Sequence, residues 1–516
     1  MKTKVFKLKY LAAACMVLGA SSAFAATAVV CDATTSAATL VNTCTPEITM
    51  YVAGSSALAG AITQVAPADL FDGTITKVID NGGTGNSSHV SAWYGTAKSA
   101  LGTAAAGKKL FVVYNNQNGS AAGISQLLST TKDTTIPEQD VVTIGPISKV
   151  AGVVAATQAA AVGGANTCTL NADISAVTAD ATHIASPLMH SVTCTTHART
   201  QADVGVTDVA PVYLFALEGA KPKTLSTLTT FPLAIQGFGI GVNANLYNAL
   251  QTQQIADGRI PSTCTAGDLT AKCQPSIRRA DYASLASTEG SIKSAAALLG
   301  NSDTTLLELQ RRDNLSGTQS SSNVFFLGNP CLTSLDSKGK TIKGVVGGEL
   351  HPLDTTPDAT KLTVTLNSTG GGVTTPLADA TKTDYVIGVL GLNTAEPDRT
   401  STSWKYVKID GVSPNYNADD TPNHKNRDAF ANGNYEFAVT SYAATQVKPF
   451  SKTSVVTTYP AVVSALITGL KDSTLHDLAG IGYVDGAADP SSLDGFNKQA
   501  HYIHTAGNSC SPLIKM

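Results

Sequence analysis

Short apolar runs alternate along this chain with stretches whose apolar residues have a helical spacing. Residues 47–54, 109–116 and 231–243 are such runs, and each predicts a β-strand. Residues 55–66 and 119–129 follow the first two runs, have helical spacing and carry serine near their start. Because strands that alternate with helices form mostly parallel sheets, the pattern predicts an α/β protein.

The same alternation continues through the second half of the chain. The further predicted strands are residues 203–214, 306–312, 383–393 and 435–443. The further predicted helices are residues 291–300, residues 459–470 and a stretch that begins at Asn323. Two stretches interrupt the rhythm, from about Thr130 to Ala202 and from about Ser334 to Thr381. The first is dominated by Ala, Thr and Val, and the second is rich in Thr, Gly, Asp and Pro. We interpret both as insertions that decorate the α/β core.

The first 25 residues have the pattern of a signal peptide. A basic segment with four lysines precedes an apolar core from Leu11 to Leu18 and a small-residue cleavage site at Ala23-Phe24-Ala25. The mature chain is therefore expected to begin at Ala26 and to be periplasmic, secreted or on the cell surface of a Gram-negative-type bacterium. No later apolar run reaches the roughly 18 residues of a membrane-spanning helix, so no integral membrane segment is expected in the mature chain.

Composition narrows the class of partner. The 516 residues carry a net charge of −3, and only 14% of them are charged, so nothing points to nucleic acid. A chain of this length predicts two or three domains or lobes.

Eight cysteines remain when Cys15, inside the signal peptide, is set aside. An even number in an exported chain indicates disulfides. Proximity in the sequence favours three short-range pairs and leaves one long-range pair: Cys31–Cys44 in an N-terminal extension (residues 26–47), Cys168–Cys194, Cys264–Cys273, and Cys331–Cys510. This pairing is a hypothesis, because eight cysteines allow about 105 pairings. No metal site is expected, because no C-x-x-C or clustered Cys/His spacing occurs.

One pattern occurs three times: a predicted strand, then glycine next to serine, then a predicted helix. The three sites are Gly54-Ser55-Ser56, Gly119-Ser120 and Ser316-Gly317-Thr318. Each serine can cap its helix. Each motif also lies at the carboxyl end of a predicted strand, where ligands bind in open α/β sheets, and helix starts attract oxyanions. Arg312, four residues before Ser316, adds a permanent cation. The residues alone leave both interpretations open, a cap and an anion site.

Asp208 ends another predicted strand and is either a turn residue or a ligand. A carboxylate at an anion site repels a fully ionised oxyanion but accepts a hydrogen bond from one that still carries a proton. Phosphate is largely protonated at neutral pH and sulfate is not. Arg312 together with Asp208 would therefore favour phosphate over sulfate.

Five motifs, in order, resemble the phosphate-binding periplasmic proteins of ABC transporters. AGSSA resembles the family's A-G-A-T-F loop, VVYNNQNGSAAGISQLL its Y-x-x-x-G-S-S-G-G-I segment, and VGVTDVAPVYL its F-G-A-S-D-A-P-L segment. FPLAIQGFGIGVN resembles the strand that follows, and QRRDNLSGTQSS resembles R-R-x-D-G-S-G-T-S. The resemblance implies an α/β type II periplasmic-binding fold, with two lobes and a cleft.

Position by position, the resemblance places the phosphate ligands on both lobes. They are Ser56, Ser120, Asp208, Arg312, Ser316, Gly317 and Thr318, with Ser55 and Ala57 in the first loop. The chain departs from the family in three places: Ala57 replaces a bulky residue, Ala121 a common serine, and Asn314 an aspartate that would hold the arginine. The neighbouring Asp313 is a candidate substitute for that aspartate. These departures put the affinity in question more than anion binding itself.

The architecture implied is two lobes with the ligand between them. Lobe one is expected to hold residues 48–239 and 437–516, and lobe two residues 240–436. The expected function is a monomeric, non-enzymatic solute-binding protein for inorganic phosphate or a close oxyanion, for uptake through an inner-membrane ABC permease or for scavenging. No cofactor is expected. Two alternatives stay open: a secreted phosphatase on the same fold, and a surface or extracellular-assembly protein that has lost phosphate binding.

Overall fold

The structure is a computed structural model of the whole chain. It describes residues 46–80, 90–116, 119–128, 202–214, 225–287, 290–314, 316–329, 360–394, 404–414, 433–447 and 454–472, with shorter segments at 141–143, 167–170, 188–196, 198–200, 333–335, 341–346, 481–483, 502–504 and 513–515 and single residues 331, 396 and 510.

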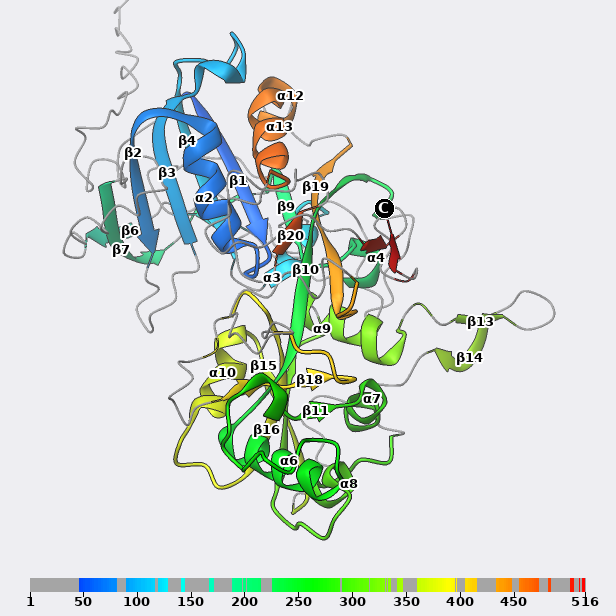
Figure 1. Cartoon of the computed structure of the whole chain (residues 1–516). Coiled ribbons are helices and arrows are strands. Elements are labelled where there is room, and N and C mark those ends of the chain that lie inside the picture. The colour runs from blue at the N-terminus through cyan, green and yellow to red at the C-terminus, as the bar shows by residue number, and fades with distance from the viewer. Residues whose placement is uncertain are drawn as a thin grey trace, which may run out of the picture.

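One run of paired strands passes through the whole molecule. Its order is β15-β12-β16-β10-β19-β9-β1-β4-β3-β2-β7-β6. The strands from β19 to β2 and the helices on them form what we call the first lobe; β15, β12 and β16 and their helices form the second lobe (Figure 1). The boundaries are β19 Ala438–Gln446, β9 Val204–Thr207, β1 Ile48–Gly54, β4 Lys109–Asn115, β3 Val90–Ala97, β2 Phe71–Asp80, β15 Leu362–Asn367, β12 Leu307–Arg312 and β16 Tyr385–Gly391.

Strand β10 (Leu228–Val242) belongs to both lobes. Its first part pairs antiparallel with β19, and its last part, from Phe238, pairs antiparallel with β16. In Figure 1 it runs through the middle of the molecule from one lobe into the other. Two α/β lobes joined by a strand that runs through both confirm the predicted fold class, a type II periplasmic-binding fold.

Parallel pairing determines where the helices begin. In the first lobe β1 pairs parallel with both β4 and β9, and in the second lobe β12 pairs parallel with both β15 and β16. Five of these strands lead into helices at their carboxyl ends: α2 (Ala59–Leu70), α3 (Gly119–Ser125), α4 (Pro211–Leu214), α9 (Gly317–Ser322) and α10 (Gly370–Ala378). Parallel strands need such crossovers, so these helix starts collect at one edge of each sheet.

Each lobe has its own apolar core. In the second lobe, strands β10, β12 and β16 pack against α6 (Ala244–Ala256), whose first turn is capped by the Asn243 side chain. In the first lobe, β1 and β4 pack against α2 and α13 (Pro460–Gly469), which begins with proline in its first turn. The residue boundaries predicted for the two lobes stay a prediction.

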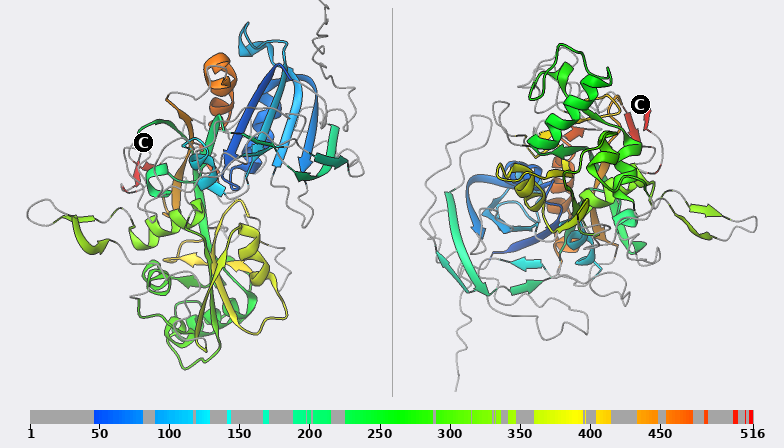
Figure 2. Two further views of the ribbon diagram at one scale, coloured as in Figure 1. Left: turned by 180° about the vertical axis from the view of Figure 1, so that it is seen from behind. Right: turned by 90° about the horizontal axis from the view of Figure 1, so that it is seen from below.

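Several local predictions were wrong. The predicted insertion from Ser334 to Thr381 is too long, because β15 is a parallel strand of the second-lobe sheet and α10 packs on that sheet. Figure 2 shows that its earlier part includes the projecting hairpin of β13 (Thr333–Leu335) and β14 (Thr341–Val346). The helix expected at Asn323 begins at Gly317 and continues as a π-helix over Asn323–Leu327. Strands β2 and β3 were not predicted.

Two of the four predicted disulfides are present. Cys264 is bonded to Cys273, and Cys331 is bonded to Cys510. Cys168 and Cys194 lie opposite each other in the pairing of β6 (Thr167–Leu170) with β7 (Leu188–Thr196); their disulfide stays a prediction. Cys31 and Cys44 lie outside the described residues. No helix in the described part of the chain is long and apolar enough to span a bilayer.

Candidate functional site

The start of α9 is fixed by a capped turn after β12. The Ser316 hydroxyl accepts the backbone N–H of Gln319 at 3.4 Å, and the Gln319 side-chain oxygen accepts the backbone N–H of Arg312 at 3.0 Å. The backbone N–H of Ser316 donates to the Asp313 carbonyl at 3.2 Å. Ser316, Gly317 and Thr318 are buried. The predicted cap is therefore real, and it gives the helix start a fixed direction.

Gly317 brings that helix start against the first lobe. A Cβ atom at this position would lie 2.3 Å from Ser120 Oγ and 2.6 Å from Asp208 Oδ2. Such distances are shorter than any side chain tolerates, so glycine is required for this approach. Ser120 and Asp208 were expected on the first lobe and Gly317 on the second, and the structure brings the three residues together.

Asp208 lies just after β9 and is 4% exposed. It accepts a hydrogen bond from the Ser55 hydroxyl, and its own backbone N–H donates to Ser120 Oγ at 3.1 Å. Burial raises the pKa of the Asp208 carboxyl, while the Ser55 hydrogen bond, the Arg312 charge and Ser120 each act to lower it. Burial is the largest of these effects, so the pKa of the Asp208 carboxyl is raised overall, and the three neighbouring groups act against that rise.

The first loop reaches the site through Ser55. Its hydroxyl accepts the backbone N–H groups of Ala57 at 3.1 Å and Leu58 at 3.2 Å, in the turn that precedes α2. The Tyr114 hydroxyl donates to the Ser55 carbonyl. The side chain of Ser56, the residue that the resemblance assigned as the ligand, is exposed. The neighbour Ser55 is the residue that contacts Asp208.

Close glycine packing places Ser120 beside Asp208. A Cβ atom at Gly123 in α3 would lie 2.7 Å from the Ala53 carbonyl oxygen and 2.7 Å from the Val206 carbonyl oxygen. Gly54 has a φ of 130°, which a residue with a side chain rarely adopts. Helix α3 therefore lies directly on the ends of β1 and β9, with Ser120 in its first turn.

Arg312 is buried, with 6% of its surface exposed. Its Nε donates to the Asn367 carbonyl at 3.1 Å and its Nη2 to the Ser368 carbonyl at 2.9 Å. Burial lowers the pKa of the guanidinium, and the charges of Asp313 and Asp208 raise it. An arginine in this setting keeps its positive charge.

Arg312 is held without the aspartate that the family pattern has at position 314. Asn314, at that position, accepts a hydrogen bond from Arg311 and not from Arg312. The carbonyls at the end of β15 orient Arg312 instead. These carbonyls were not predicted, because β15 falls in a stretch that was interpreted as an insertion. The order LTVTLN then STGGG nevertheless repeats the pattern of strand, small-residue turn and helix found elsewhere in the chain.

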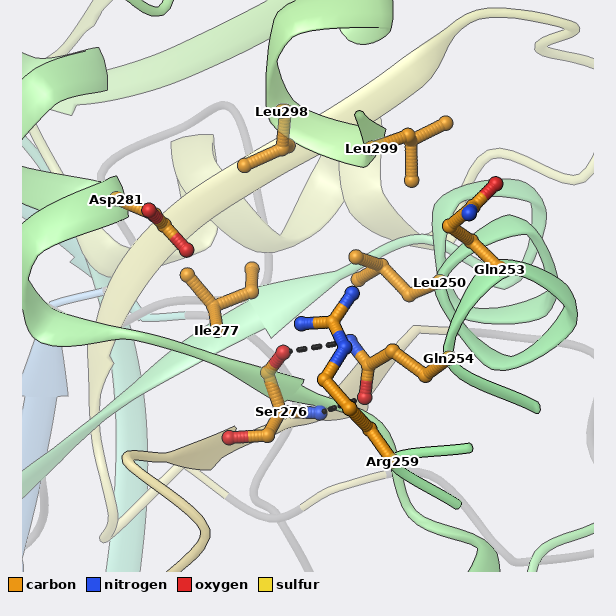
Figure 3. Close-up of a pocket in the computed structure, with 9 residues that line it drawn as sticks. All are labelled: Leu250, Gln253, Gln254, Arg259, Ser276, Ile277, Asp281, Leu298 and Leu299. Carbon is orange, nitrogen blue, oxygen red and sulfur yellow. Dashed lines mark hydrogen bonds between the residues drawn. The ribbon is translucent and has the colours of Figure 1, made fainter. Parts of the chain in front are cut away.

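A separate small cavity lies in the second lobe, away from these residues. Figure 3 shows it between α6, α7 (Arg279–Ala286), α8 (Ala295–Leu299) and β11 (Ser276–Ile277). The Gln254 amide closes one side, with hydrogen bonds to the backbone carbonyl and N–H of Ser276 at 2.7 and 2.9 Å. Arg259 pairs with Asp257, and Asp281 with Arg278. These polar groups are engaged within the fold, so the cavity is a packing feature.

Comparison with known proteins gives only remote structural similarity. No family model matches the chain, and no curated protein matches it. An ABC-type phosphate transport receptor from Vibrio cholerae is 16% identical, with 53% of this chain and 75% of the receptor covered and a TM-score of 0.28. PstS from Borrelia burgdorferi is 10% identical, with 83% of this chain and 94% of PstS covered and a TM-score of 0.31. Because both TM-scores are below 0.5, the choice of ligand rests on the geometry of this chain.

Proposed function

We propose that this chain is an exported solute-binding protein that captures inorganic phosphate, or a close oxyanion, between its two lobes. The observation that carries the proposal is the approach of Gly317 to Asp208 and Ser120. It places a helix start of the second lobe against a buried carboxylate and a hydroxyl of the first lobe. Arg312 lies close enough to act on the charge of Asp208.

Each group has a distinct part in binding. The start of α9 and the Arg312 guanidinium attract the anion, and the hydroxyls of Ser120, Ser316 and Thr318 are available as donors. The Ser55 hydroxyl donates to Asp208 and so orients that carboxyl. Asp208 accepts a hydrogen bond from a protonated oxygen of the ligand. A ligand with no proton, such as sulfate, would instead face a buried negative charge, so the same set of groups favours phosphate.

Isothermal titration of the mature chain with phosphate and with sulfate tests the proposal. We expect heat with phosphate and little with sulfate at pH 7. Arg312→Ala is expected to weaken phosphate binding roughly 100-fold, because a charge-assisted contact is lost in a buried site. Arg312→Lys, which keeps the charge but not the planar fork, is expected to weaken it less.

The matched control is Arg259→Ala, which removes an exposed arginine of the same lobe that pairs with Asp257. Its affinity should equal that of the wild type. Equal binding of phosphate and sulfate would reject the role given to Asp208, and no binding of either would reject the proposed function.

A further inference from the structure

Two helices, not one, begin beside Arg312. Strands β12 and β15 are parallel neighbours in register, with Arg312 opposite Asn367. The first leads into α9 and the second into α10, so both helix starts lie at the same sheet edge. Neighbouring strands are about 4.8 Å apart, so the two helix starts are within reach of one small ligand. Carboxyl ends of parallel strands are where α/β proteins bind ligands.

The start of α10 is unusual in its composition. It begins with Gly370, Gly371 and Gly372, and glycine lowers helix stability relative to alanine. Packing explains one of them, because a Cβ atom at Gly372 would lie 2.9 Å from Asn367 Oδ1. Packing does not explain the other two. A Cβ at Gly371 would come no closer than 3.7 Å to any neighbour, and one at Gly370 no closer than 4.0 Å.

Arg312 faces this glycine start. The neighbour that a Cβ at Gly370 would meet at 4.0 Å is Arg312 Nη1. Nε and Nη2 are held by the Asn367 and Ser368 carbonyls, whereas Nη1 has no hydrogen-bond partner among the described residues. The guanidinium as a whole is buried. A buried cation therefore directs an unused donor group into the space in front of the α10 start.

The α10 start also has donors to offer. Thr369 caps the helix by accepting the Gly372 N–H at 3.1 Å. The N–H groups of Gly370 and Gly371 precede the first intrahelical hydrogen bonds and have no partner in the described part of the structure. Gly371 is exposed and Gly370 half-buried, so a ligand can approach them.

We propose that the α10 start is a second anion subsite, so that the ligand is an anion with two linked phosphoryl groups. One phosphoryl group lies between α9 and Asp208, and the second lies on the N–H groups of Gly370 and Gly371. Arg312 contacts both groups. The proposal rests on the proposed function, because Arg312 and the α9 subsite are shared. The absence of side chains at Gly370 and Gly371 makes room for the second group.

The test is titration of the mature chain with inorganic phosphate and with inorganic diphosphate. We expect diphosphate to bind at least about tenfold more tightly, because it adds charge-assisted contacts at α10. Gly370→Glu places a carboxylate in front of Arg312 Nη1 and is expected to abolish this preference. Gly370→Ala adds only a methyl group to the space of the second phosphoryl group and should lower the preference less than Gly370→Glu does.

Ala380→Glu is the charge control. It adds the same charge on an exposed residue beyond the far end of α10 and should leave the preference intact. Diphosphate that binds no more tightly than phosphate would overturn the inference and leave the proposed function standing. A Gly370→Glu variant that keeps the wild-type preference would also overturn the inference. Diphosphate binding without phosphate binding would support the second subsite and reject phosphate as the ligand. No binding of either ion would overturn both proposals.

Discussion

Gly317→Ala tests whether the approach of the two lobes controls ligand binding. The φ angle of Gly317 is not in the left-handed region, so alanine fits the backbone, and alanine is the better helix residue. Its Cβ atom, however, would lie 2.3 Å from Ser120 Oγ and 2.6 Å from Asp208 Oδ2. The substitution therefore acts on the contact between lobes and leaves the folding of each lobe intact.

The size of the effect follows from these distances. An ordinary contact requires about 3.4 Å, so the start of α9 must retreat by roughly 1 Å. A ligand hydrogen bond of about 2.9 Å would lengthen to about 3.9 Å, beyond a useful length. Loss of two charge-assisted bonds, at about 1.5–3 kcal/mol each, weakens binding roughly 100- to 10,000-fold.

Titration calorimetry measures the affinity, and small-angle scattering measures how far the lobes close when ligand is added. The variant should bind weakly and show a smaller ligand-dependent decrease in radius of gyration. Gly371→Ala is the matched control, because its Cβ would meet no atom closer than 3.7 Å and phosphate binding at α9 should be unchanged. An affinity within twofold of the wild type in Gly317→Ala would refute the assignment of this contact to the site.

Two further predictions concern the parts that support the site. Burial raises the pKa of Asp203 to about 6, although the Tyr51 N–H and the Ser454 hydroxyl each donate to its carboxylate at 2.9 Å. The native state thus holds this proton to higher pH than the unfolded state, and the stability of the wild type should fall as the pH rises from about 4 to about 6. The Asp203→Asn variant should lack this pH dependence of the unfolding free energy, measured by urea unfolding. It should be about 2 kcal/mol more stable than the wild type at pH 7.5. An unchanged pH dependence would contradict this account. Gly123→Ala should lower stability by about 3 kcal/mol, since its Cβ would meet two backbone carbonyls at 2.7 Å, and an unaltered melting temperature would show that α3 can move away from the sheet.

The sequence pattern was most informative where strands are wholly buried. Every residue of β4 except the first is buried, and its continuous apolar run made the strand recognisable. Strand β15 alternates Thr with apolar residues between stretches of similar composition, so its place in the sheet was hidden until its pairing with β12 was known. Strands β2, β3 and β4 follow one another in the sequence and pair antiparallel, and β2 and β3 were missed because polar residues interrupt their apolar runs.

The site was predictable in its residue types but not in its contacts. The motifs pointed to loops that the structure brings together around Gly317, because glycine and serine before a helix have a local meaning. Contacts such as that from Ser55 to Asp208, 153 residues apart, depend on the strand order, which brings β1 beside β9. For the same reason the sequence pointed to Ser56 where Ser55 makes the contact. The carbonyls that hold Arg312 lie 55 and 56 residues away, on a strand that only pairing could place.

The shared strand β10 has a consequence for how the molecule unfolds. One end of it supplies ladder hydrogen bonds to β19 and the other end to β16. If either lobe unfolded, β10 would lose its hydrogen-bonded neighbour on that side, and the sheet of the other lobe would be destabilised where β10 enters it. Heating should therefore give a single calorimetric transition with equal calorimetric and van't Hoff enthalpies, even though each lobe has a core of its own.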